Sequence, residues 1–252
     1  MQNVFITGAS SGIGAQLARL YAERGSRLGL LALAGADLVA VTEGAKRSGA
    51  GAVHAYGADV RDRGAMRKAV ADFAAAAGSI DVYVGCAGVD LDVPFDANYR
   101  SERAERNFEV NLMGLMYGAN AAVEILRAQR HGQLVGVGSM AGWRIFPVHA
   151  DYSASKTAVH AYLESLRVRL RGSAITVSTV YPGQVRTPMT ADSRHKVPLS
   201  WSAEQAAERI VRGIDRREEH IAFPWPVVAV ARALEALPEP LWRLALRFGP
   251  KS

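Results

Sequence analysis

The sequence predicts an α/β protein built on a doubly wound, mostly parallel sheet of seven strands with helices on both faces. Short β-branched and apolar runs alternate with longer segments of helical period along the chain. Runs such as NVFIT and ITVSTV are apolar enough to be buried on both faces, as parallel strands are. No linker, repeat or low-complexity tract divides the 252 residues, so we expect one domain over 1–252.

The expected elements follow one another in strict alternation. Strands are expected at Asn3–Thr7, Arg27–Ala32, Ala52–Tyr56, Val82–Gly85, Gln133–Val137, Ile175–Tyr181 and His220–Phe223. Helices are expected at Gly12–Arg24, Asp37–Lys46, Arg63–Ala76, Arg103–Arg130, Tyr152–Arg171 and Ala203–Arg217. Gly25, Gly132 and Gly172 stand where helices end and suit C-caps. Ser202, with Gln205 three residues later, is a capping-box start.

The composition excludes several classes of protein. Charged residues are 21% and hydrophobic residues 49%, ordinary values for a globular domain. The net charge of +6 comes from scattered residues without interleaved aromatics, so no nucleic-acid partner is expected. Cys86 is the single cysteine, which excludes an internal disulfide and a cysteine zinc cluster, and we expect no metal. Without a signal peptide or an apolar run of about 18 residues, the chain is expected to be cytoplasmic.

The segment TGASSGIG, from Thr7 to Gly14, joins the first strand to the first helix. Gly8 can turn the chain, Gly12 lets backbone approach a ligand, and Gly14 lets the helix pack on the strand. The helix N-terminus then offers N–H groups to a pyrophosphate. Ser10 and Ser11 add hydroxyl donors. This context predicts a dinucleotide site of the Rossmann type.

Two further positions carry chemistry that is weak evidence when taken alone. Tyr152 and Lys156 are four residues apart, which places them on one face of a helix. An ammonium beside a phenol lowers its pKa, because it stabilises the phenolate. Asp59 follows the third strand, where it fits either an adenine amino group or the cap of the next turn.

Together these motifs resemble the short-chain dehydrogenase/reductase family. The motifs are the glycine loop, Asp59, Asn111 in NFEVNLMG, Ser139 thirteen residues before Tyr152, Lys156, and the Pro-Gly-x-x-x-Thr element of Pro182, Gly183 and Thr187. The resemblance covers residues 3 to about 223. It implies that Tyr152 exchanges a proton with an alcohol or carbonyl oxygen and that Lys156 lowers its pKa and binds the nicotinamide ribose. Ser139 would hold the substrate oxygen, and Asn111 would anchor a water in a proton relay.

The resemblance also implies which residues bind a nicotinamide dinucleotide. They are Gly8, Ser10, Ser11, Gly12, Ile13, Gly14, Asp59, Val60, Ala87, Gly88, Tyr152, Lys156, Pro182, Gly183, Val185 and Thr187.

Two departures from the family pattern bear on the cofactor. The fourth strand ends in Gly85–Gly88 with Cys86 where the family has asparagine, so local hydrogen bonding is expected to loosen. Leu33–Gly35 carries neither the acid that selects NAD nor the arginine that selects NADP. Without an acid to repel a phosphate, and with Ser10, Ser11 and Arg61 near, NADP is favoured over NAD, although both remain open.

The segments expected near the substrate are apolar or loop-forming. Trp143, Ile145 and Phe146 indicate an apolar substrate, unless they pack the loop or a subunit contact. Residues 189–200 are expected to form a substrate lid, in which Arg194, His195 and Lys196 either meet an acidic substrate or lie in solvent. His149 either contacts substrate or caps the helix.

The C-terminal residues 224–252 form an apolar, tryptophan-bearing extension. We interpret it as helices that pack on the domain or a partner. The alternative is a membrane-surface patch anchored by Trp225, Trp242 and Leu244, with Arg232, Arg243 and Arg247 near lipid phosphate.

The predicted function is an NAD(P)-dependent oxidoreductase of alcohols and carbonyls that acts as a homodimer or homotetramer, the oligomer being implied by the resemblance. The alternatives are a silent nucleotide-binding scaffold and a membrane-surface reductase of an apolar substrate.

Overall fold

The computed structural model describes residues 1–91, 100–143, 150–191 and 199–242. One sheet of seven strands, all parallel, has the order β3-β2-β1-β4-β5-β6-β9. The strands are β1 (Asn3–Thr7), β2 (Arg27–Ala32), β3 (Ala52–Gly57), β4 (Val82–Gly85), β5 (Gly132–Val137), β6 (Ile175–Pro182) and β9 (His220–Phe223). The predicted sheet is confirmed, each predicted strand lying within one residue of its observed bounds.

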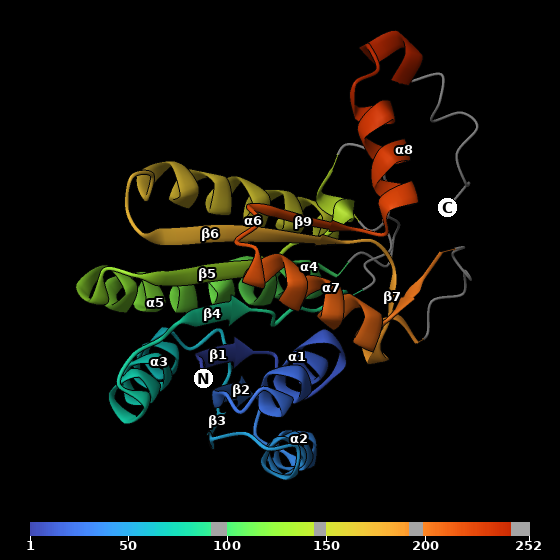
Figure 1. The fold of residues 1–252 in the computed structure, drawn as a ribbon. Coiled ribbons are helices and arrows are strands. Elements are labelled where there is room, and N and C mark those ends of the chain that lie inside the picture. The colour runs from blue at the N-terminus through green and yellow to red at the C-terminus, as the bar shows by residue number, and fades with distance from the viewer. Residues whose placement is uncertain (92–99, 144–149, 192–198, 243–252) are drawn as a thin grey trace.

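Helices cover both faces of this sheet (Figure 1). On one face lie α1 (Gly12–Glu23), α2 (Ala36–Arg47) and α7 (Ala203–Asp215); on the other lie α3 (Arg63–Ala77), α5 (Leu115–Gln129) and α6 (Ala150–Arg169). The predicted capping is confirmed in part: Gly25 follows α1 with a φ of +70°, whereas α5 ends at the left-handed Arg130, and Gly132 is already the first residue of β5. Ser202 and Gln205 form the predicted capping box of α7, and Asp62 caps α3 by accepting from the Ala65 N–H at 2.9 Å.

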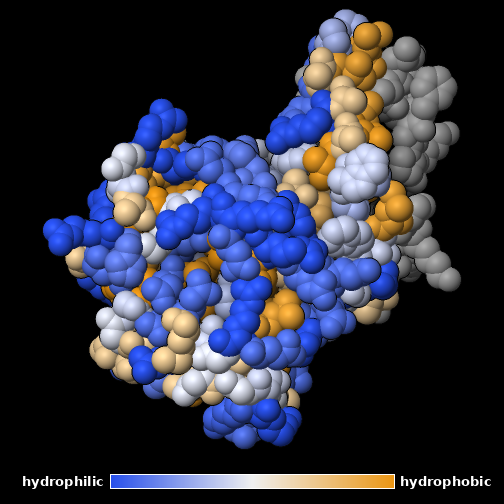
Figure 2. All heavy atoms as spheres, in the orientation of Figure 1, coloured by the Kyte–Doolittle hydropathy of each residue, from blue (hydrophilic) through white to orange (hydrophobic). Residues whose placement is uncertain are grey.

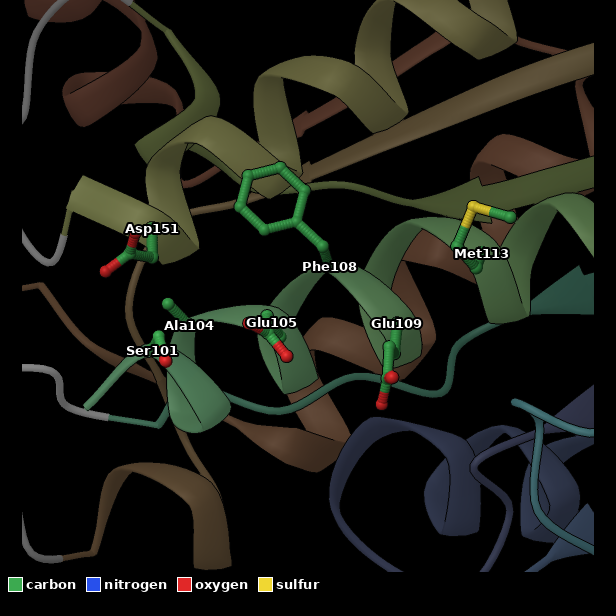
Figure 3. Close-up of a pocket in the computed structure, with 7 residues that line it drawn as sticks. All are labelled: Ser101, Ala104, Glu105, Phe108, Glu109, Met113 and Asp151. Carbon is green, nitrogen blue, oxygen red and sulfur yellow. The ribbon is translucent and has the colours of Figure 1, made fainter.

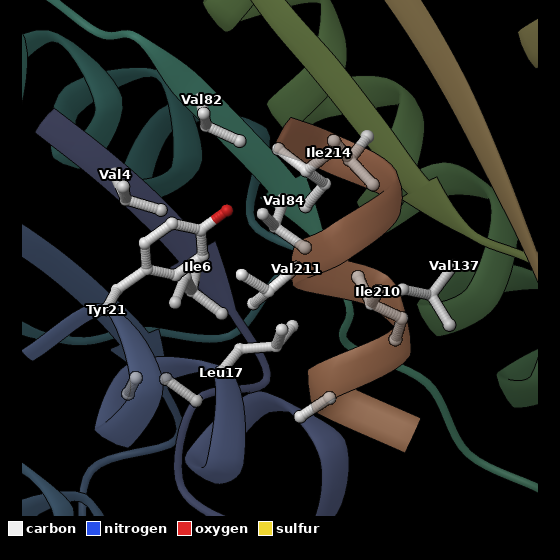
Figure 4. Close-up of a cluster of buried hydrophobic side chains, with 14 of the residues drawn as sticks. Val4, Ile6, Leu17, Tyr21, Val82, Val84, Val137, Ile210, Val211 and Ile214 are labelled. Carbon is white, nitrogen blue, oxygen red and sulfur yellow. The ribbon is translucent and has the colours of Figure 1, made fainter. Parts of the chain in front are cut away.

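The first core lies between the sheet and the helices α1 and α7 (Figure 4). Its residues come from β1 and β4, from the buried faces of α1 and α7, and from the end of β5. They include Val4, Ile6, Leu17, Tyr21, Val82, Val84, Ile210 and Ile214. The second core lies on the opposite face, where the Phe5 ring stacks on Tyr83 with centroids 5.8 Å apart. Burial on both faces explains why the strands are continuously apolar.

The helix predicted over Arg103–Arg130 is wrong as one continuous helix. It divides into α4 (Ser101–Phe108), the π-helical segment η1 (Glu109–Gly114) and α5. A π segment accommodates one extra residue in a turn, and such bulges are frequent at functional sites. Gly114 packs closely on the turn that follows β3, since a Cβ on Gly114 would lie 2.7 Å from Val60 Cγ2.

Several smaller elements lie between the main strands and helices. The pair β7 (Val185–Arg186) and β8 (Trp201–Ser202) makes a separate two-stranded sheet that was not predicted. The short 3-10 segments η2 (Met140–Gly142) and η3 (Pro188–Thr190) follow β5 and β7.

Helix α8 (Trp225–Glu235) follows β9 and stands out from that end of the sheet (Figure 1). Its inner side joins a third apolar cluster with Met140, Trp143, Tyr181 and Trp242. Trp225, its first residue, is 77% exposed. Figure 2 shows hydrophobic surface on the projecting helix. Trp242 is buried, so it does not serve as the exposed anchor of the membrane alternative.

Leu244, Arg243 and Arg247 lie outside the described residues. None of the helices within the described ranges is long and apolar enough to cross a membrane.

Candidate active site

The loop between β1 and α1 requires its glycines. Gly8 and Gly12 have φ angles of +66° and +53°, in the left-handed region that favours glycine. A Cβ on Gly14 would lie 2.2 Å from the carbonyl oxygen of Gly8. The loop therefore closes tightly against the first turn of α1.

The N-terminus of α1 is suited to an anion. Ser11 occupies the N-cap without a side-chain capping bond, and the first turn carries no acidic residue. The N–H groups of residues 12–14 precede the helical bond from Ala15 N–H to the Ser11 carbonyl and, as in any helix, lack intrahelical acceptors. Ser10 lies in the same loop. These donors and the helix dipole fit the pyrophosphate of a dinucleotide.

The end of β4 joins this loop to the interior of the site. The Thr7 hydroxyl oxygen accepts from the N–H groups of Cys86 and Ala87 at 3.1 and 3.2 Å. A Cβ on Gly8 would lie 2.7 Å from the Ala87 Cα. The expected loosening at Cys86 is therefore offset by the threonine hydroxyl, which holds both peptide groups in place.

The Pro-Gly-x-x-x-Thr element also reaches the glycine loop. Pro182 ends β6, and the Gly183 N–H donates to a β9 carbonyl at 2.7 Å. Val185 is buried where β7 begins. The Thr187 methyl group would lie 3.1 Å from a Cβ on Gly12. Residues from β1, β4 and β6 thus meet at the carboxyl ends of neighbouring parallel strands, where α/β sheets bind ligands.

Tyr152 and Lys156 lie one turn apart in α6, and the Lys156 ammonium is 5.7 Å from the Tyr152 ring centroid. Lys156 is buried and donates to the Val137 carbonyl oxygen, at the end of β5, at 3.1 Å. The Ser139 side chain lies near enough to the Tyr152 phenol to lower its pKa. The Ser139 oxygen also accepts from the Ala141 N–H at 3.0 Å, which fixes the turn. The structure thus brings this predicted trio together.

Asn111 connects three segments around the pair. Its Oδ1 accepts from the Val89 N–H at 2.8 Å, and its Nδ2 donates to the Val89 carbonyl at 2.9 Å. Nδ2 also donates to the Ser155 hydroxyl at 3.0 Å, and that hydroxyl donates to the Tyr152 carbonyl at 2.7 Å. Both amide hydrogens of Asn111 are used by the protein, so a water bound here would donate to Oδ1.

The pKa values of the pair are displaced in opposite directions. Burial raises the pKa of Tyr152 to about 12; the Ser139 hydrogen bond lowers it and the Asp90 charge raises it. Burial lowers the pKa of Lys156 to about 8, against the charges of Cys86 and Asp90. The expectation that Lys156 depresses the tyrosine pKa is therefore not met in the protein alone, because desolvation of the phenolate dominates.

The region where the adenosine is expected shows one unforeseen ion pair. Asp59 Oδ1 accepts from Arg61 Nε at 3.1 Å and Asp59 Oδ2 accepts from Arg61 Nη2 at 2.7 Å, and Arg61 also pairs with Glu109 at 3.0 Å. The hydrogen bond from Arg61 lowers the pKa of Asp59. Arg61 is thus engaged by two carboxylates rather than free for a phosphate. Asp59 Oδ1 also accepts from the Arg61 backbone N–H at 2.9 Å, so Asp59 caps the turn that follows β3, while Asp62 caps α3.

The end of β2 carries no charged side chain to discriminate between NAD and NADP. Leu33 is 64% exposed there, and Gly35 caps α2 without a side-chain bond. The segment offers neither an acid that would repel a 2′-phosphate nor an arginine that would bind it.

Part of the predicted substrate region can be described. Trp143 is buried with its ring centroid 5.1 Å from that of Tyr181, and the Arg232 guanidinium lies 4.4 Å from the Trp143 centroid. Trp143 thus packs the loop, the second role considered for it. The remaining candidates lie outside the described residues: Ile145, Phe146, His149, Arg194, His195 and Lys196. Residues 192–198 of the predicted lid also lie outside them.

A pocket of about 460 Å³ lies between α4 and the start of α6 (Figure 3). Phe108, Glu105, Glu109 and Asp151 line it, whereas Tyr152 and Ser139 do not. It is therefore an outward hollow beside the candidate catalytic centre.

Two residues near the pair were missed by the sequence reasoning. Asn107 is fully buried and binds the backbone of Leu91 through both its amide atoms. Asp90 acts on the pKa of Tyr152 and Lys156. The repeat of asparagine at a four-residue interval in NFEVN was a signal for the first; nothing local marks the second.

Comparisons with known proteins agree with this geometry. A family model described as short chain dehydrogenase matches residues 2–198. An uncharacterized oxidoreductase of Myxococcus xanthus is 33% identical over 98% of this chain and 96% of its own. The 11-beta-hydroxysteroid dehydrogenase 1A of Arabidopsis thaliana is 32% identical over 88% of this chain and 68% of its own.

A solved short-chain dehydrogenase from Sphingobium yanoikuyae, in complex with NADPH, superposes with a TM-score of 0.80. It is 27% identical, over 95% of this chain and 97% of the other. The fold and the site therefore define an oxidoreductase with a parallel, Rossmann-type sheet. The chain belongs to the short-chain dehydrogenase/reductase family.

Proposed function

We propose that the protein is an NAD(P)-dependent oxidoreductase that interconverts a secondary alcohol and a ketone or aldehyde. The observation that carries the proposal is the meeting of Tyr152, Ser139 and Lys156 beside the glycine loop. A phenol, a hydroxyl and a buried cation at one place suit proton transfer to an oxygen that gains negative charge.

The residues divide the chemistry among them. When bound, the nicotinamide supplies or accepts the hydride. With a pKa of about 12, Tyr152 holds its proton at neutral pH and donates it to the carbonyl oxygen during reduction. Ser139 donates a hydrogen bond to the same oxygen and orients it. Lys156, protonated below its pKa of about 8, stabilises the tyrosinate that remains.

The glycine loop and the N-terminus of α1 would hold the pyrophosphate, and Lys156 the nicotinamide ribose. Asp59 and Val60 would border the adenine, Ala87 and Gly88 its ribose, and residues 182–187 the nicotinamide. NADP is preferred over NAD because the turn at Leu33 lacks a repelling acid. The NADPH bound by the Sphingobium yanoikuyae relative supports that order.

The proposal extends to the organisation of the chain. One catalytic domain spans 1–252, with 189–200 as a substrate lid and 224–252 as a helical extension that packs beside the site. The substrate is a small, apolar alcohol or carbonyl compound. The protein is cytoplasmic and forms a homodimer or homotetramer through α4, α5 and α6, whose outer surface includes the exposed Val168.

The test is a titration with NADPH and NADH, followed by nicotinamide fluorescence, and then an assay of NADPH oxidation with a panel of aldehydes and ketones. We expect tighter binding of NADPH and turnover of apolar carbonyls. Ser139→Ala should lower kcat by roughly 100-fold or more, whereas Ser48→Ala, at the end of α2, should not. Cofactor binding without turnover across the panel would refute the proposal and favour a silent scaffold.

A further inference from the structure

The segment from Ser139 to Trp143, which we call the serine turn, is a compact unit. The Ala141 N–H donates to the Ser139 hydroxyl at 3.0 Å, and the Gly142 N–H donates to the Ser139 carbonyl at 3.1 Å. The Trp143 N–H donates to the Met140 carbonyl at 3.0 Å. Because these bonds join the two ends of the turn, a displacement of Trp143 is transmitted to Ser139.

The serine turn rests on α6 beside the catalytic lysine. A Cβ on Gly142 would lie 2.8 Å from the Lys156 carbonyl carbon, so the two backbones are in direct contact. The Gly142 carbonyl also accepts from the Thr157 hydroxyl at 2.9 Å. The position of the turn therefore decides where the Ser139 hydroxyl lies relative to the residues that α6 carries.

Helix α8 packs on the same turn. Trp143 is buried, and its ring centroid lies 5.1 Å from that of Tyr181. The Arg232 guanidinium lies over the Trp143 ring, 4.4 Å from its centroid, which is the distance of a cation–π contact. Met140 belongs to the same buried cluster as Ala231 of α8. The C-terminal helix thus reaches the turn that carries Ser139.

The ion pair that Arg232 makes on its own helix does not account for this contact. Arg232 pairs with Glu235 at 2.9 Å, and the two side chains are 56% and 37% exposed. Exposed pairs of this kind contribute little to stability. The pair instead limits the directions open to the arginine side chain, and the observed direction places the guanidinium over Trp143.

We propose that Arg232 is a positioning residue for the reaction: by holding Trp143 in place, it keeps the Ser139 hydroxyl where the substrate oxygen binds. The inference rests on the proposed function, in which Ser139 acts on that oxygen. Arg232 acts only through the serine turn. Its loss should therefore lower kcat and leave cofactor binding unchanged.

The first measurement is a double-mutant cycle between Arg232 and Ser139. Arg232→Ala should lower kcat for carbonyl reduction by about tenfold and change the KM for NADPH by less than about twofold. In the Ser139→Ala background the same substitution should change kcat by less than about twofold, because no hydroxyl is left to position. An equal loss of kcat in both backgrounds would show a general structural effect and would overturn the inference.

Arg212→Ala is the matched control. The Arg212 side chain is also 56% exposed and pairs with a glutamate of its own helix, Glu208, but it lies in the last turn of α7. Its kcat should stay within about twofold of the wild type. A loss in Arg232→Ala no larger than the loss in this control would likewise count against the positioning role.

The second measurement needs neither cofactor nor substrate. Hydrogen exchange, followed by mass spectrometry of peptides that cover the serine turn, reports the opening of the bonds made by the Ala141, Gly142 and Trp143 N–H groups. Exchange of these groups should be about tenfold faster in Arg232→Ala and unchanged in Arg212→Ala. Unchanged exchange in Arg232→Ala would overturn the inference even if the enzyme is active. If the wild type reduces no carbonyl compound, the proposed function fails instead, and exchange still decides whether Arg232 holds the turn.

Discussion

At the scale of the residue, the burial of the charged Lys156 side chain is the main cost of the site to the stability of the fold. Burial lowers its pKa from 10.5 to about 8, so the folded protein holds this proton less tightly than the unfolded chain does. A shift of that size corresponds to about 3 kcal/mol of destabilisation at neutral pH. The hydrogen bond to the Val137 carbonyl offsets part of that cost. The protein thus keeps a cation beside Tyr152, although burial favours the neutral amine.

Lys156→Met should therefore abolish turnover and yet raise the free energy of unfolding at pH 7 by about 1–2 kcal/mol. Between pH 8 and 10.5 the unfolded chain binds a proton that the folded chain does not, so the wild type gains stability as pH rises and the advantage of the variant shrinks. Urea denaturation at pH 7 and 9.5 measures both effects. Lys68→Met, at an exposed site, is the control, and a destabilised Lys156→Met would contradict the account.

The same lysine sets the expected pH profile of carbonyl reduction. Tyr152, with a pKa of about 12, stays protonated through the neutral range. Lys156 loses its charge above its pKa of about 8, and with it the stabilisation of the tyrosinate. We expect kcat/KM for reduction to be level from pH 6 to 7.5 and to fall above pH 8. A profile that stays flat to pH 10 would show that the lysine charge does not assist.

At the scale of the element, two asparagines form the framework of the site. Asn111 binds the backbone of Val89, and Asn107 binds the backbone of Leu91; we call this pair the asparagine clamp. The π segment carries Asn111, and α4 carries Asn107 one turn earlier. Their amides hold the segment around residues 89–91, which pairs with no strand in the described part of the chain. Asn107→Leu should destabilise the protein by about 2–4 kcal/mol, because the N–H and C=O of Leu91 lose their partners.

Chemical denaturation of Asn107→Leu and Asn120→Leu compares their free energies of unfolding. The difference separates the loss of the clamp from the general effect of replacing a helical asparagine with leucine. Asn120 is exposed and accepts one hydrogen bond, from Tyr162. Equal stabilities of the two variants would contradict the role given to the clamp.

The glycine loop allows a paired test of the same kind. In Gly14→Ala the new methyl group would lie 2.2 Å from the Gly8 carbonyl oxygen, so the loop must open and cofactor affinity should fall by at least tenfold. Gly44→Ala, inside α2 with nothing near the new methyl group, should instead stabilise the protein by about 0.5–1 kcal/mol. Calorimetric cofactor titration and thermal unfolding of both variants measure the contrast. Undiminished cofactor binding by Gly14→Ala would contradict it.

Sequence reasoning was most successful for the strands. Runs such as Val4–Thr7 are buried on both faces, and their apolar character is local information. The break at Glu109–Gly114 was not foreseen, because one inserted residue hardly alters the helical period. The engagement of Arg61 by Asp59 and Glu109 depends on a contact between segments 48 residues apart. Composition and motif spacing do not indicate such a contact.

At the scale of the whole molecule, the parallel sheet brings all parts of the site to the carboxyl ends of its strands. The glycine loop after β1, the clamped segment after β4, Ser139 after β5 and Gly183 after β6 follow neighbouring strands. The four motifs are far apart in sequence, and the resemblance to the family implied that they meet. What the sequence did not indicate is the burial of the Lys156 cation, which results only from the fold.

Helix α8 extends this arrangement beyond the sheet. Arg232 lies over Trp143, which ends the turn that begins at Ser139, and the third apolar cluster fills the space between them. The described part of the extension, residues 224–242, is therefore packed against the turn that follows β5.

The most direct test of the central claim is the turnover of Tyr152→Phe, measured together with its affinity for NADPH. The substitution removes one hydroxyl and keeps the ring, so the fold and the cofactor site stay intact. The account predicts that carbonyl reduction falls by at least 1,000-fold, on the order of the contribution of a general acid, while the NADPH dissociation constant changes by less than about threefold. Substantial turnover in this variant would show that another group moves the proton and would contradict the role given to Tyr152.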